Sequence, residues 1–251
     1  MTSALIGHTG FVGSNLRHQV PFDAQVNSST VDELRGRRFD LVVCAGARAE
    51  KWKANQDPDA DLAGIERLLS VLREIRAERF VLVSTVDVFE TPVGVDESAP
   101  PDARHAYGRN RRMLEQLCQE RFGAQVLRLP GLFGPGLKKN AIYDLLHENQ
   151  VEKIHPDSAY QFYDVRQLWS DAEKAHASGI HLLHLATEPV AMGEIARRFF
   201  GRELRAPASS PARYDVRSHY AAMWGARGGY LRSRDDVLHG LARFVAEEQG
   251  R

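Results

Sequence analysis

Cysteine is scarce in this chain, with two residues among 251, and both lie inside apolar stretches. Two residues, Cys44 and Cys118, cannot build a disulfide framework or a zinc framework, so we expect buried free thiols in a reducing compartment. The N-terminus has neither a basic start nor a long apolar stretch, and no signal peptide is expected. No apolar run approaches the ~20 residues of a membrane span. These features predict a cytoplasmic protein.

An excess of charge of either sign is also missing, because 33 Lys and Arg residues balance 33 Asp and Glu residues. Nucleic acids and anionic membranes attract basic surfaces, so neither is expected as the main partner. His181 and His184 stand three apart on an expected strand and face opposite sides, so no metal site is predicted. The hydrophobic fraction of 43% is enough to bury a substantial core, which excludes disordered and fibrous classes.

Short, β-branched apolar runs alternate with helical segments through the first half of the chain. The runs lie at 3–6, 24–26, 39–44, 80–83 and 125–129. This alternation is typical of βαβ units, whose parallel sheet is buried on both faces. We therefore predict an α/β fold: a Rossmann-type doubly wound parallel sheet over residues 1–134, joined by parts of 155–186. A small mixed C-terminal lobe is expected over 135–251.

Two long helices are predicted, over residues 59–76 and 107–122. The first has two apolar stripes, made of Leu62, Ile65, Leu69 and Leu72 and of Leu68, Val71 and Ile75. A helix that is apolar over two faces is packed on two sides. One side is expected to face the sheet and the other a neighbouring helix or a second subunit. A homodimer through the two long helices is therefore a hypothesis.

A glycine-rich turn follows the first predicted strand and opens a helix. Its residues are Gly7, His8, Thr9, Gly10, Phe11, Val12 and Gly13. Gly7 permits a tight turn, Gly10 lets the backbone approach a pyrophosphate, and Gly13 lets helix and strand pack closely. The helix N-terminus then presents N–H groups to the phosphates. At the start of a βαβ series, this turn predicts dinucleotide binding.

The second strand ends without the Asp or Glu that usually accepts from the ribose 2′-OH of NAD. Its end is polar and uncharged, with Asn27, Ser28 and Ser29. Asp32 is at about the right sequence distance, but Thr30 and Glu33 have the spacing of a capping box, which places Asp32 in a helical first turn. A 2′-phosphate would instead meet hydroxyls and nearby arginines, which favours NADP over NAD by a small margin. Those arginines are Arg35, Arg37 and Arg38.

Further motifs follow in a characteristic order. Ser-Thr-Val-Asp-Val-Phe occupies 84–89 after the fourth strand, Tyr107 opens the long helix, and Arg111 follows four residues later. With the glycine turn, they resemble the extended short-chain dehydrogenase/reductase family, its NAD-dependent epimerase/dehydratase group. That family has G-x-x-G-x-x-G, then S-T/S-x-x-V-Y, then Y-x-x-x-K. The resemblance extends over 42–47, 127–136 and 185–190, and implies a Rossmann fold, an NAD(P) cofactor and a nucleotide-linked sugar as substrate.

The resemblance also implies catalytic roles by motif position. Tyr107 would be the acid/base, Thr85 would hydrogen-bond the reacting oxygen, and Arg111 would lower the pKa of Tyr107 and hold the nicotinamide ribose. A tyrosine moves protons near neutral pH only if its pKa of ~10 falls by about 3 units, which one cation ~4 Å away supplies. The family has Lys at position 111, and Arg keeps the charge but meets the ribose differently.

Asp87 is a further catalytic and substrate candidate. In the family's dehydratases an acidic pair follows the threonine, but this chain has Val86 in the first of the two positions. Redox or epimerisation is therefore favoured over dehydration, and the compact chain resembles the family's 4-keto-sugar reductases. A polar cap on the strand is the alternative reading of Asp87. A weak or inactive NAD(P)-binding module acting through a protein partner is the alternative for the whole chain.

The remaining candidates also follow from the resemblance. Further cofactor contacts would come from Asn27, Ser28, Ser29, Cys44, Ala45, Gly46, Ala47, Ser84 and Pro130. Further substrate contacts would come from Trp52, Lys138, Asn140, Gln161 and Tyr163. Helix capping is the alternative for Lys138 and Asn140, and a core position is the alternative for the aromatic strand that contains Tyr163.

Overall fold

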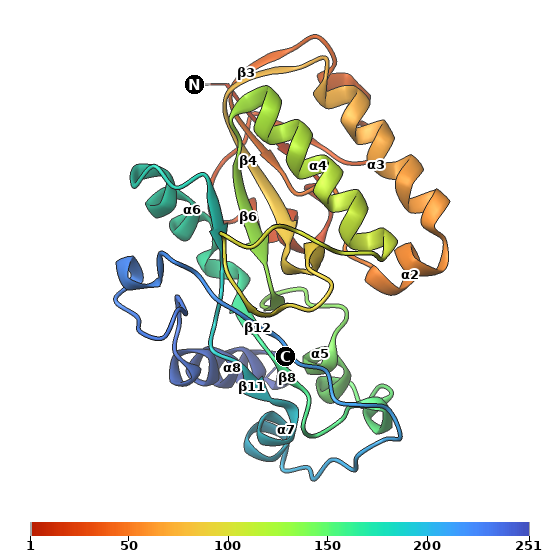
Figure 1. Ribbon diagram of the computed structural model, residues 1–251, viewed down its shortest axis with the longest axis vertical. Coiled ribbons are helices and arrows are strands. Elements are labelled where there is room, and N and C mark those ends of the chain that lie inside the picture. Colours follow the sequence, from red (N-terminus) through yellow and green to blue (C-terminus); the bar gives the residue numbers. More distant parts are fainter. Residues whose placement is uncertain (1, 251) are drawn as a thin grey trace. The chain divides into compact units, whose positions relative to one another are not determined.

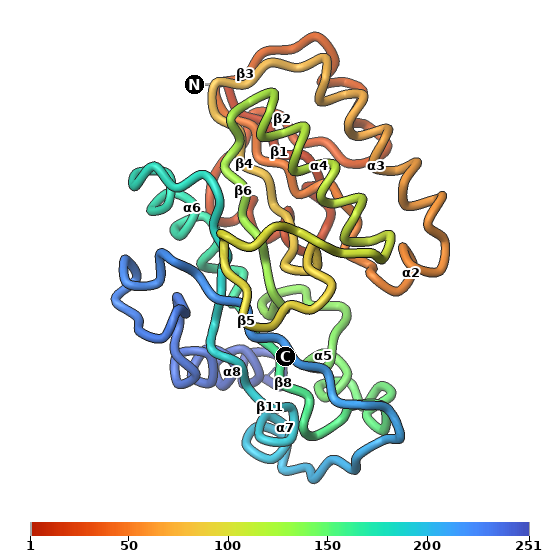
Figure 2. The backbone as a smooth tube through the Cα atoms, in the orientation of Figure 1, coloured from red at the N-terminus to blue at the C-terminus, as the bar shows by residue number. Residues whose placement is uncertain are grey.

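The computed structural model describes residues 2–250, which divide into two compact units. The first unit contains residues 2–91, 100–128 and 166–183, and the second contains Pro92–Ala99, Leu129–Val165 and 184–250. Figure 2 traces the backbone through both units. The segment Pro92–Ala99 joins the second unit because β5 (Val93–Val95) pairs in parallel with β12 (Asp215–Val216).

A six-stranded sheet forms the centre of the first unit (Figure 1), which confirms the predicted fold class. Its order is β10-β6-β4-β3-β1-β2. The strands are β1 (Ser3–Ile6), β2 (Ala24–Val26), β3 (Arg38–Cys44), β4 (Arg76–Thr85), β6 (Gln125–Leu129) and β10 (Leu182–His184). β1 pairs in parallel with β2 and β3, and β3 pairs in parallel with β4. The chain changes direction across the sheet at β1, and ligands of such sheets bind at the carboxyl ends of the strands there.

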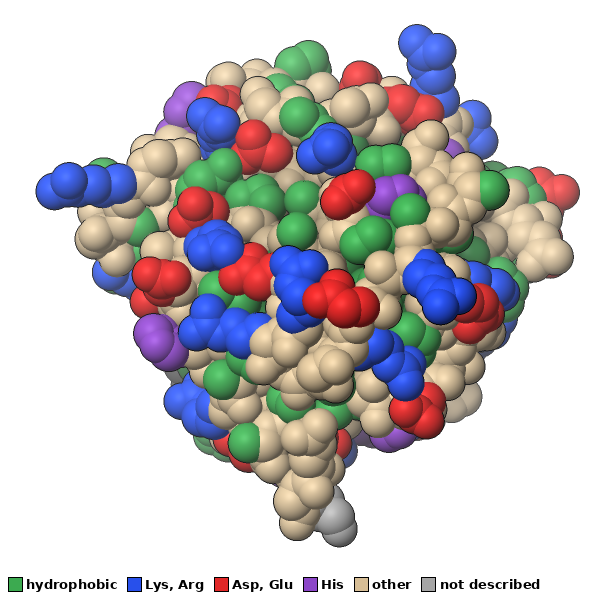
Figure 3. Space-filling model, turned by 90° about the horizontal axis from the view of Figure 1, so that it is seen from below, with side chains coloured by type: hydrophobic (Ala, Val, Ile, Leu, Met, Phe, Trp, Pro, Cys, Tyr) green, Lys and Arg blue, Asp and Glu red, His purple; other side chains and the backbone are tan. Residues whose placement is uncertain are grey.

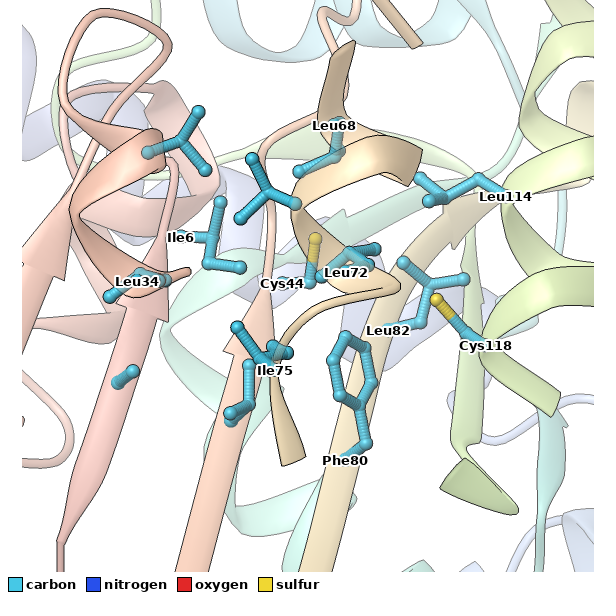
Figure 4. Packing of buried hydrophobic residues seen from close by; sticks show 14 of the residues in the cluster. Ile6, Leu34, Cys44, Leu68, Leu72, Ile75, Phe80, Leu82, Leu114 and Cys118 are labelled. Carbon is cyan, nitrogen blue, oxygen red and sulfur yellow. The ribbon is translucent and has the colours of Figure 1, made fainter. Parts of the chain in front are cut away.

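Helices cover both faces of this sheet. α3 (Pro58–Leu72) and α4 (Ala106–Phe122) lie side by side on one face (Figure 1), and Figure 4 shows their core with the sheet. On the other face, residues of α1 (Phe11–Leu16) and α6 (Leu168–Ala177) lie against Val81 and Val83 of β4. Phe80 and Leu82 point to the first face, because side chains alternate along a strand.

The predicted helix 59–76 is shorter in the structure, because α3 ends at Leu72 and β4 already begins at Arg76. Most of its two apolar stripes is buried inside the first unit. The buried members are Ile65, Leu68, Leu69, Val71 and Leu72, with Ile75 beyond the helix end. The sheet and α4 therefore account for the two-sided apolarity within one chain.

The second unit is built from short strands and three helices around its own core. β7 (Gly131–Phe133) pairs in parallel with β9 (Phe162–Asp164), and β11 (Val190–Ala191) pairs antiparallel with β8 (Ala159–Tyr160). The helices are α5 (Ala141–Leu146), α7 (Met192–Phe200) and α8 (Arg234–Gln249). On the face in Figure 3, acidic and basic side chains lie interleaved.

Short 3-10 helices complete the secondary structure. They are η1 (Val31–Leu34), η2 (Val86–Val88), η3 (Val151–Lys153), η4 (Val165–Gln167) and η5 (Ala221–Trp224). Among residues 2–250, no helix is both long and apolar enough to cross a membrane.

Replacing Gly13 by Ala should destabilise the first unit strongly. A Cβ at Gly13 would lie 2.1 Å from the Gly7 carbonyl oxygen, so turn and helix would have to separate, at about 3 kcal/mol. Gly64 is the matched control, because its Cβ would meet no atom within 4 Å inside α3. We expect Gly64→Ala to stabilise by about 0.5–1 kcal/mol. Urea denaturation measures both, and equal midpoints for the two variants would contradict the close approach.

Candidate functional site

The glycine turn lies at the carboxyl end of β1, against the loop that follows β3. Gly7 has a φ of +89°, and a Cβ there would lie 2.4 Å from the Ala45 carbonyl oxygen, so both conformation and space require glycine. At Gly10 the φ is −74° and a Cβ would be 3.4 Å from its nearest neighbour, an ordinary contact. Neither backbone strain nor packing therefore requires glycine at position 10.

The end of β2 is held by its own polar residues. The Asn27 side-chain oxygen accepts from the Ser29 N–H at 2.9 Å, and the Thr30 hydroxyl accepts from the Asn27 N–H at 3.1 Å. The predicted capping box at Thr30 is wrong, because this residue makes no side-chain cap to η1. Asp32 does lie in the first turn of η1, as predicted, and pairs with Arg67 at 2.6 Å.

The nearby arginines are engaged elsewhere. Arg38 begins β3 and pairs with Glu78 at 2.9 Å, and the Arg37 guanidinium lies 4.9 Å from the centre of the Phe39 ring. The start of this seven-residue strand is about 20 Å from its carboxyl end, so the predicted contact of Arg37 and Arg38 with a 2′-phosphate is wrong. Arg35 pairs with Asp32 of η1 and with Glu74, beyond the end of α3.

Thr85 ends β4 and Tyr107 stands in the first turn of α4. Tyr107 is 6% exposed, and burial raises the pKa of its phenol to about 12, while Arg111 and the Thr85 hydroxyl lower it. The predicted direction of the Arg111 effect is confirmed. The predicted net fall of the pKa is wrong for this protein, because the loss of hydration exceeds the effect of the cation.

Arg111 lies beneath the Tyr107 ring, with its guanidinium carbon 4.0 Å from the ring centre. One Nη donates to the Asp61 carboxylate and the other to the Arg48 carbonyl. Asp61 also accepts from the Asn110 amide at 2.8 Å. The positive charge of Arg111 is therefore balanced by Asp61 of α3 inside the fold. Its Nε is buried and has no hydrogen-bond partner within residues 2–250.

The first turn of α4 is fixed tightly against the end of β4. A Cβ on Gly108 would lie 2.3 Å from the Asp87 carbonyl oxygen, so only glycine fits there. The His105 Nδ1 caps the helix by accepting from the Gly108 N–H at 3.1 Å. The Tyr107 N–H donates to the Asn55 side chain, on α2 (Lys51–Gln56), at 3.1 Å. These contacts fix the first turn of α4 and with it the backbone of Tyr107.

Asp87 has a partner that the sequence analysis missed. Its carboxylate lies 2.7 Å from Lys51 Nζ, and its own N–H donates to the Thr85 hydroxyl at 3.1 Å. Burial first and then the Lys51 charge lower the pKa of His105 beside this pair. Lys51, Asn55 and Asp61 belong to no motif, and only the chain's return along α2 and α3 brings them to this edge.

A second buried ion pair, between α4 and β6, holds α4 on the sheet. Glu115 of α4 accepts from Arg128 of β6 through two bonds, at 2.9 and 2.7 Å, and from the Ser84 hydroxyl of β4 at 2.6 Å. Glu115 is fully buried and Arg128 is 1% exposed. The sequence held a signal for this pair, namely an Arg inside an apolar strand and a Glu beside Leu114 on an apolar helix face.

The other predicted residues have the following environments. Cys44 is buried, which raises the pKa of its thiol to about 11, whereas Trp52 is 62% exposed and Lys138 is exposed. Asn140 caps α5 by accepting from the N–H groups of Ile142 and Tyr143, which was the alternative reading.

Gln161 and Tyr163 are both 1% exposed within the second unit. The Gln161 amide donates to the Thr187 and Val216 carbonyls, so it joins segments of that unit. The glycine turn, Ala45, Thr85, Asp87, Tyr107 and Arg111 share the first unit, whereas Pro130, Lys138, Asn140, Gln161 and Tyr163 belong to the second.

The fold and the glycine turn define the class of Rossmann-type α/β proteins. The sequence profile of the NAD dependent epimerase/dehydratase family matches residues 20–163, more than half of the chain, and the chain belongs to this family. This confirms the resemblance seen in its motifs. No curated protein sequence matches the chain.

Solved structures with the same fold cover nearly the whole chain. A dTDP-4-dehydrorhamnose reductase from Clostridium acetobutylicum has a TM-score of 0.75 at 15% identity, covering 99% of this chain and 100% of its own. The Bacillus anthracis enzyme of that name, in complex with NADP, has a TM-score of 0.74 at 20% identity, covering 98% and 99%. A dTDP-glucose 4,6-dehydratase from Streptomyces venezuelae, with NAD bound, has a TM-score of 0.76 at 16% identity, covering 100% and 98%.

The raised pKa of Tyr107 predicts a loss of stability in alkali. The unfolded chain releases this proton near pH 10, while the folded protein holds it to about pH 12, so stability falls as pH rises through that interval. Two pKa units correspond to about 3 kcal/mol. In Tyr107→Phe the fall between pH 10 and 12 should be shallower by that amount, as measured by urea denaturation at each pH. Parallel curves for variant and parent would contradict the assignment.

Proposed function

We propose that this protein is an NAD(P)-dependent oxidoreductase of nucleotide-linked sugars, resembling 4-keto-sugar reductases, with Tyr107 as the proton donor. The carrying observation is the close approach of the first turn of α4, with Tyr107, to the end of β4, with Thr85, in the unit that also contains the glycine turn. A proton-transferring group must lie within hydrogen-bond reach of the reacting oxygen. Family membership and the reductases of the same fold support this substrate class.

The residues of the first unit fit a nicotinamide dinucleotide. Gly10 is exposed, and neither its packing nor its backbone conformation requires glycine. The buried His8 Nδ1 and Arg111 Nε have no hydrogen-bond partner within residues 2–250. The glycine turn would hold the pyrophosphate. The end of β2 would hold the adenosine ribose through Asn27, Ser28 and Ser29. The loop 44–47 would line the cofactor, which supplies or accepts the hydride when bound. We retain NADP over NAD on the uncharged end of β2 alone, since the arginines bind other groups.

The protonation state of Tyr107 favours reduction. With a pKa of about 12 the phenol carries its proton at neutral pH, which is the form that donates to a carbonyl oxygen receiving a hydride. The reverse reaction, and the first half of an epimerisation, need the phenolate. Thr85 would hold the same oxygen, and Arg111 would steady the ring from below. Dehydration is not supported, because Val86 is apolar and Asp87 pairs with Lys51.

A cofactor-binding module acting through a protein partner is the second candidate function. The observation in its favour is the Arg111–Asp61 pair, which balances the charge beside Tyr107 within the fold. Both candidate functions require cofactor binding, so cofactor binding cannot distinguish them. Only the enzyme would turn over a substrate.

Tyr107→Phe decides between them. Purified protein is mixed with NADPH or NADH and a panel of nucleotide 4-keto sugars, and cofactor oxidation is followed by absorbance. We expect turnover that falls about 10²- to 10⁴-fold in Tyr107→Phe, with cofactor affinity unchanged, because only the donated proton is lost. If the protein binds the cofactor without turnover, and Tyr107→Phe leaves the cofactor affinity unchanged, the result would support the cofactor-binding module. A rate that appears only in Arg111→Lys would indicate a weakened enzyme.

We also propose a homodimer through α3 and α4 in a cytoplasmic protein. The two helices share one face of the sheet, and Met113 of α4 is 38% exposed there. Sedimentation at micromolar concentration should show a dimer, and Met113→Glu should shift it to monomer, because a charge would be buried at the contact. Met223, 44% exposed in the second unit, provides the control Met223→Glu. Monomer alone in the parent protein would remove the proposal.

A further inference from the structure

His105 is the N-cap residue of α4, and its ring holds the turn that contains Tyr107. Its Nδ1 accepts from the Gly108 N–H at 3.1 Å, the usual contact between an N-cap side chain and the third residue of a helix. The N–H of Tyr107 itself donates to the Asn55 side chain at 3.1 Å. The position of this turn therefore depends on two hydrogen bonds to side chains, and one of the two acceptors is a titratable ring.

The hydrogen bond to Gly108 determines where His105 carries its proton. Because Nδ1 is the acceptor, the neutral ring has its hydrogen on Nε2. Nε2 is buried and has no hydrogen-bond partner within residues 2–250. A second proton can go only to Nδ1, and an imidazolium has no acceptor left. Protonation of His105 therefore ends the cap and leaves the N–H of the buried Gly108 without a partner.

The surroundings of His105 oppose this protonation. Burial first, and then the charge of Lys51 on α2, lower the pKa of the ring below its usual value of 6.5. Arg109 of α4 acts in the same direction, whereas Asp87 of η2 and Glu90 just beyond η2 act in the opposite one. The ring also lies at the N-terminus of a 17-residue helix, whose positive dipole end disfavours a cation. His105 is therefore neutral at pH 7, and the cap is lost only in acid.

We propose that His105 is a positioning residue for Tyr107, and that protonation of its ring releases the first turn of α4 and stops the reaction in acid. The inference rests on the proposed function. Tyr107 itself predicts no loss of rate in acid, because its phenol has a pKa of about 12 and already carries the proton that it donates. The charged groups facing Tyr107 are each paired, Arg111 with Asp61 and Asp87 with Lys51.

Two substitutions at position 105 separate the cap from the titration. His105→Asn keeps an acceptor for the Gly108 N–H but does not titrate, because asparagine is among the best N-cap residues. His105→Ala removes the acceptor at every pH. In the keto-sugar assay, we expect the parent kcat to fall about 10-fold per pH unit below the pKa of His105, and that of His105→Asn to stay within about 2-fold. At pH 7, His105→Ala should have the low kcat that the parent reaches in acid.

A matched control is another histidine of the first unit. His176 is exposed in the last turn of α6, and His176→Asn should keep the pH profile of the parent. A purely structural role of His105 would change kcat by the same factor at every pH in His105→Asn. An acid loss of kcat that survives in His105→Asn, or a parent profile that stays flat through the titration of His105, would overturn the proposal.

A second measurement does not depend on turnover. Ring nitrogen chemical shifts of the cofactor-free protein give the tautomer and the pKa of His105, and His105→Ala identifies the signal. We expect the hydrogen on Nε2 at pH 7, and the Gly108 amide should lose its protection from hydrogen exchange with the same midpoint, but not in His105→Asn. A hydrogen on Nδ1 would overturn the proposal. If no keto sugar is reduced, the proposed function fails, whereas the tautomer and the Gly108 protection still test the cap.

Discussion

A single buried carboxylate, Glu115, holds together the elements on which the candidate site depends. A charge removed from water is tolerated only with close partners, and Arg128 and Ser84 supply them from β6 and β4. The pair fixes α4 along the sheet, so that its first turn meets the end of β4. Gly108 then allows the first turn of α4, which contains Tyr107, to approach the Asp87 carbonyl just beyond Thr85. The geometry of the candidate site therefore depends on a buried charge that lies outside it.

Two cations of the candidate site, Arg111 and Lys51, differ in burial and in partner. At position 111 the side chain is buried, permanently charged and paired with Asp61, so it orients the Tyr107 ring without exchanging protons. Lys51 is more exposed and paired with Asp87, which is connected to Thr85. In the proposed reductase, Arg111 would hold the ring of Tyr107, while Lys51 holds the Asp87 carboxylate at the end of β4.

Features that depend on a local pattern could be predicted from the sequence. Gly7 and Gly13 were recognised because a tight turn between strand and helix has a fixed spacing, and the alternation of strands and helices predicted the parallel sheet. Contacts of a side chain with a distant partner could not be predicted. The capping box at Thr30 did not form, since Asn27 takes the hydroxyl, and Arg37 and Arg38 lie at the opposite end of β3. The pKa of Tyr107 was misjudged because burial cannot be read from neighbours in the chain.

The order of residues was enough to predict the fold class, the glycine turn and the succession of Thr85, Tyr107 and Arg111, because these depend on periodicity and spacing along the chain. The pairs of Arg111 with Asp61 and of Asp87 with Lys51, and the three elements joined by Glu115, became visible in the folded chain alone. Each of these contacts joins residues far apart in the chain. Electrostatic effects depend on distance and burial, and both are set by how helices pack on the sheet.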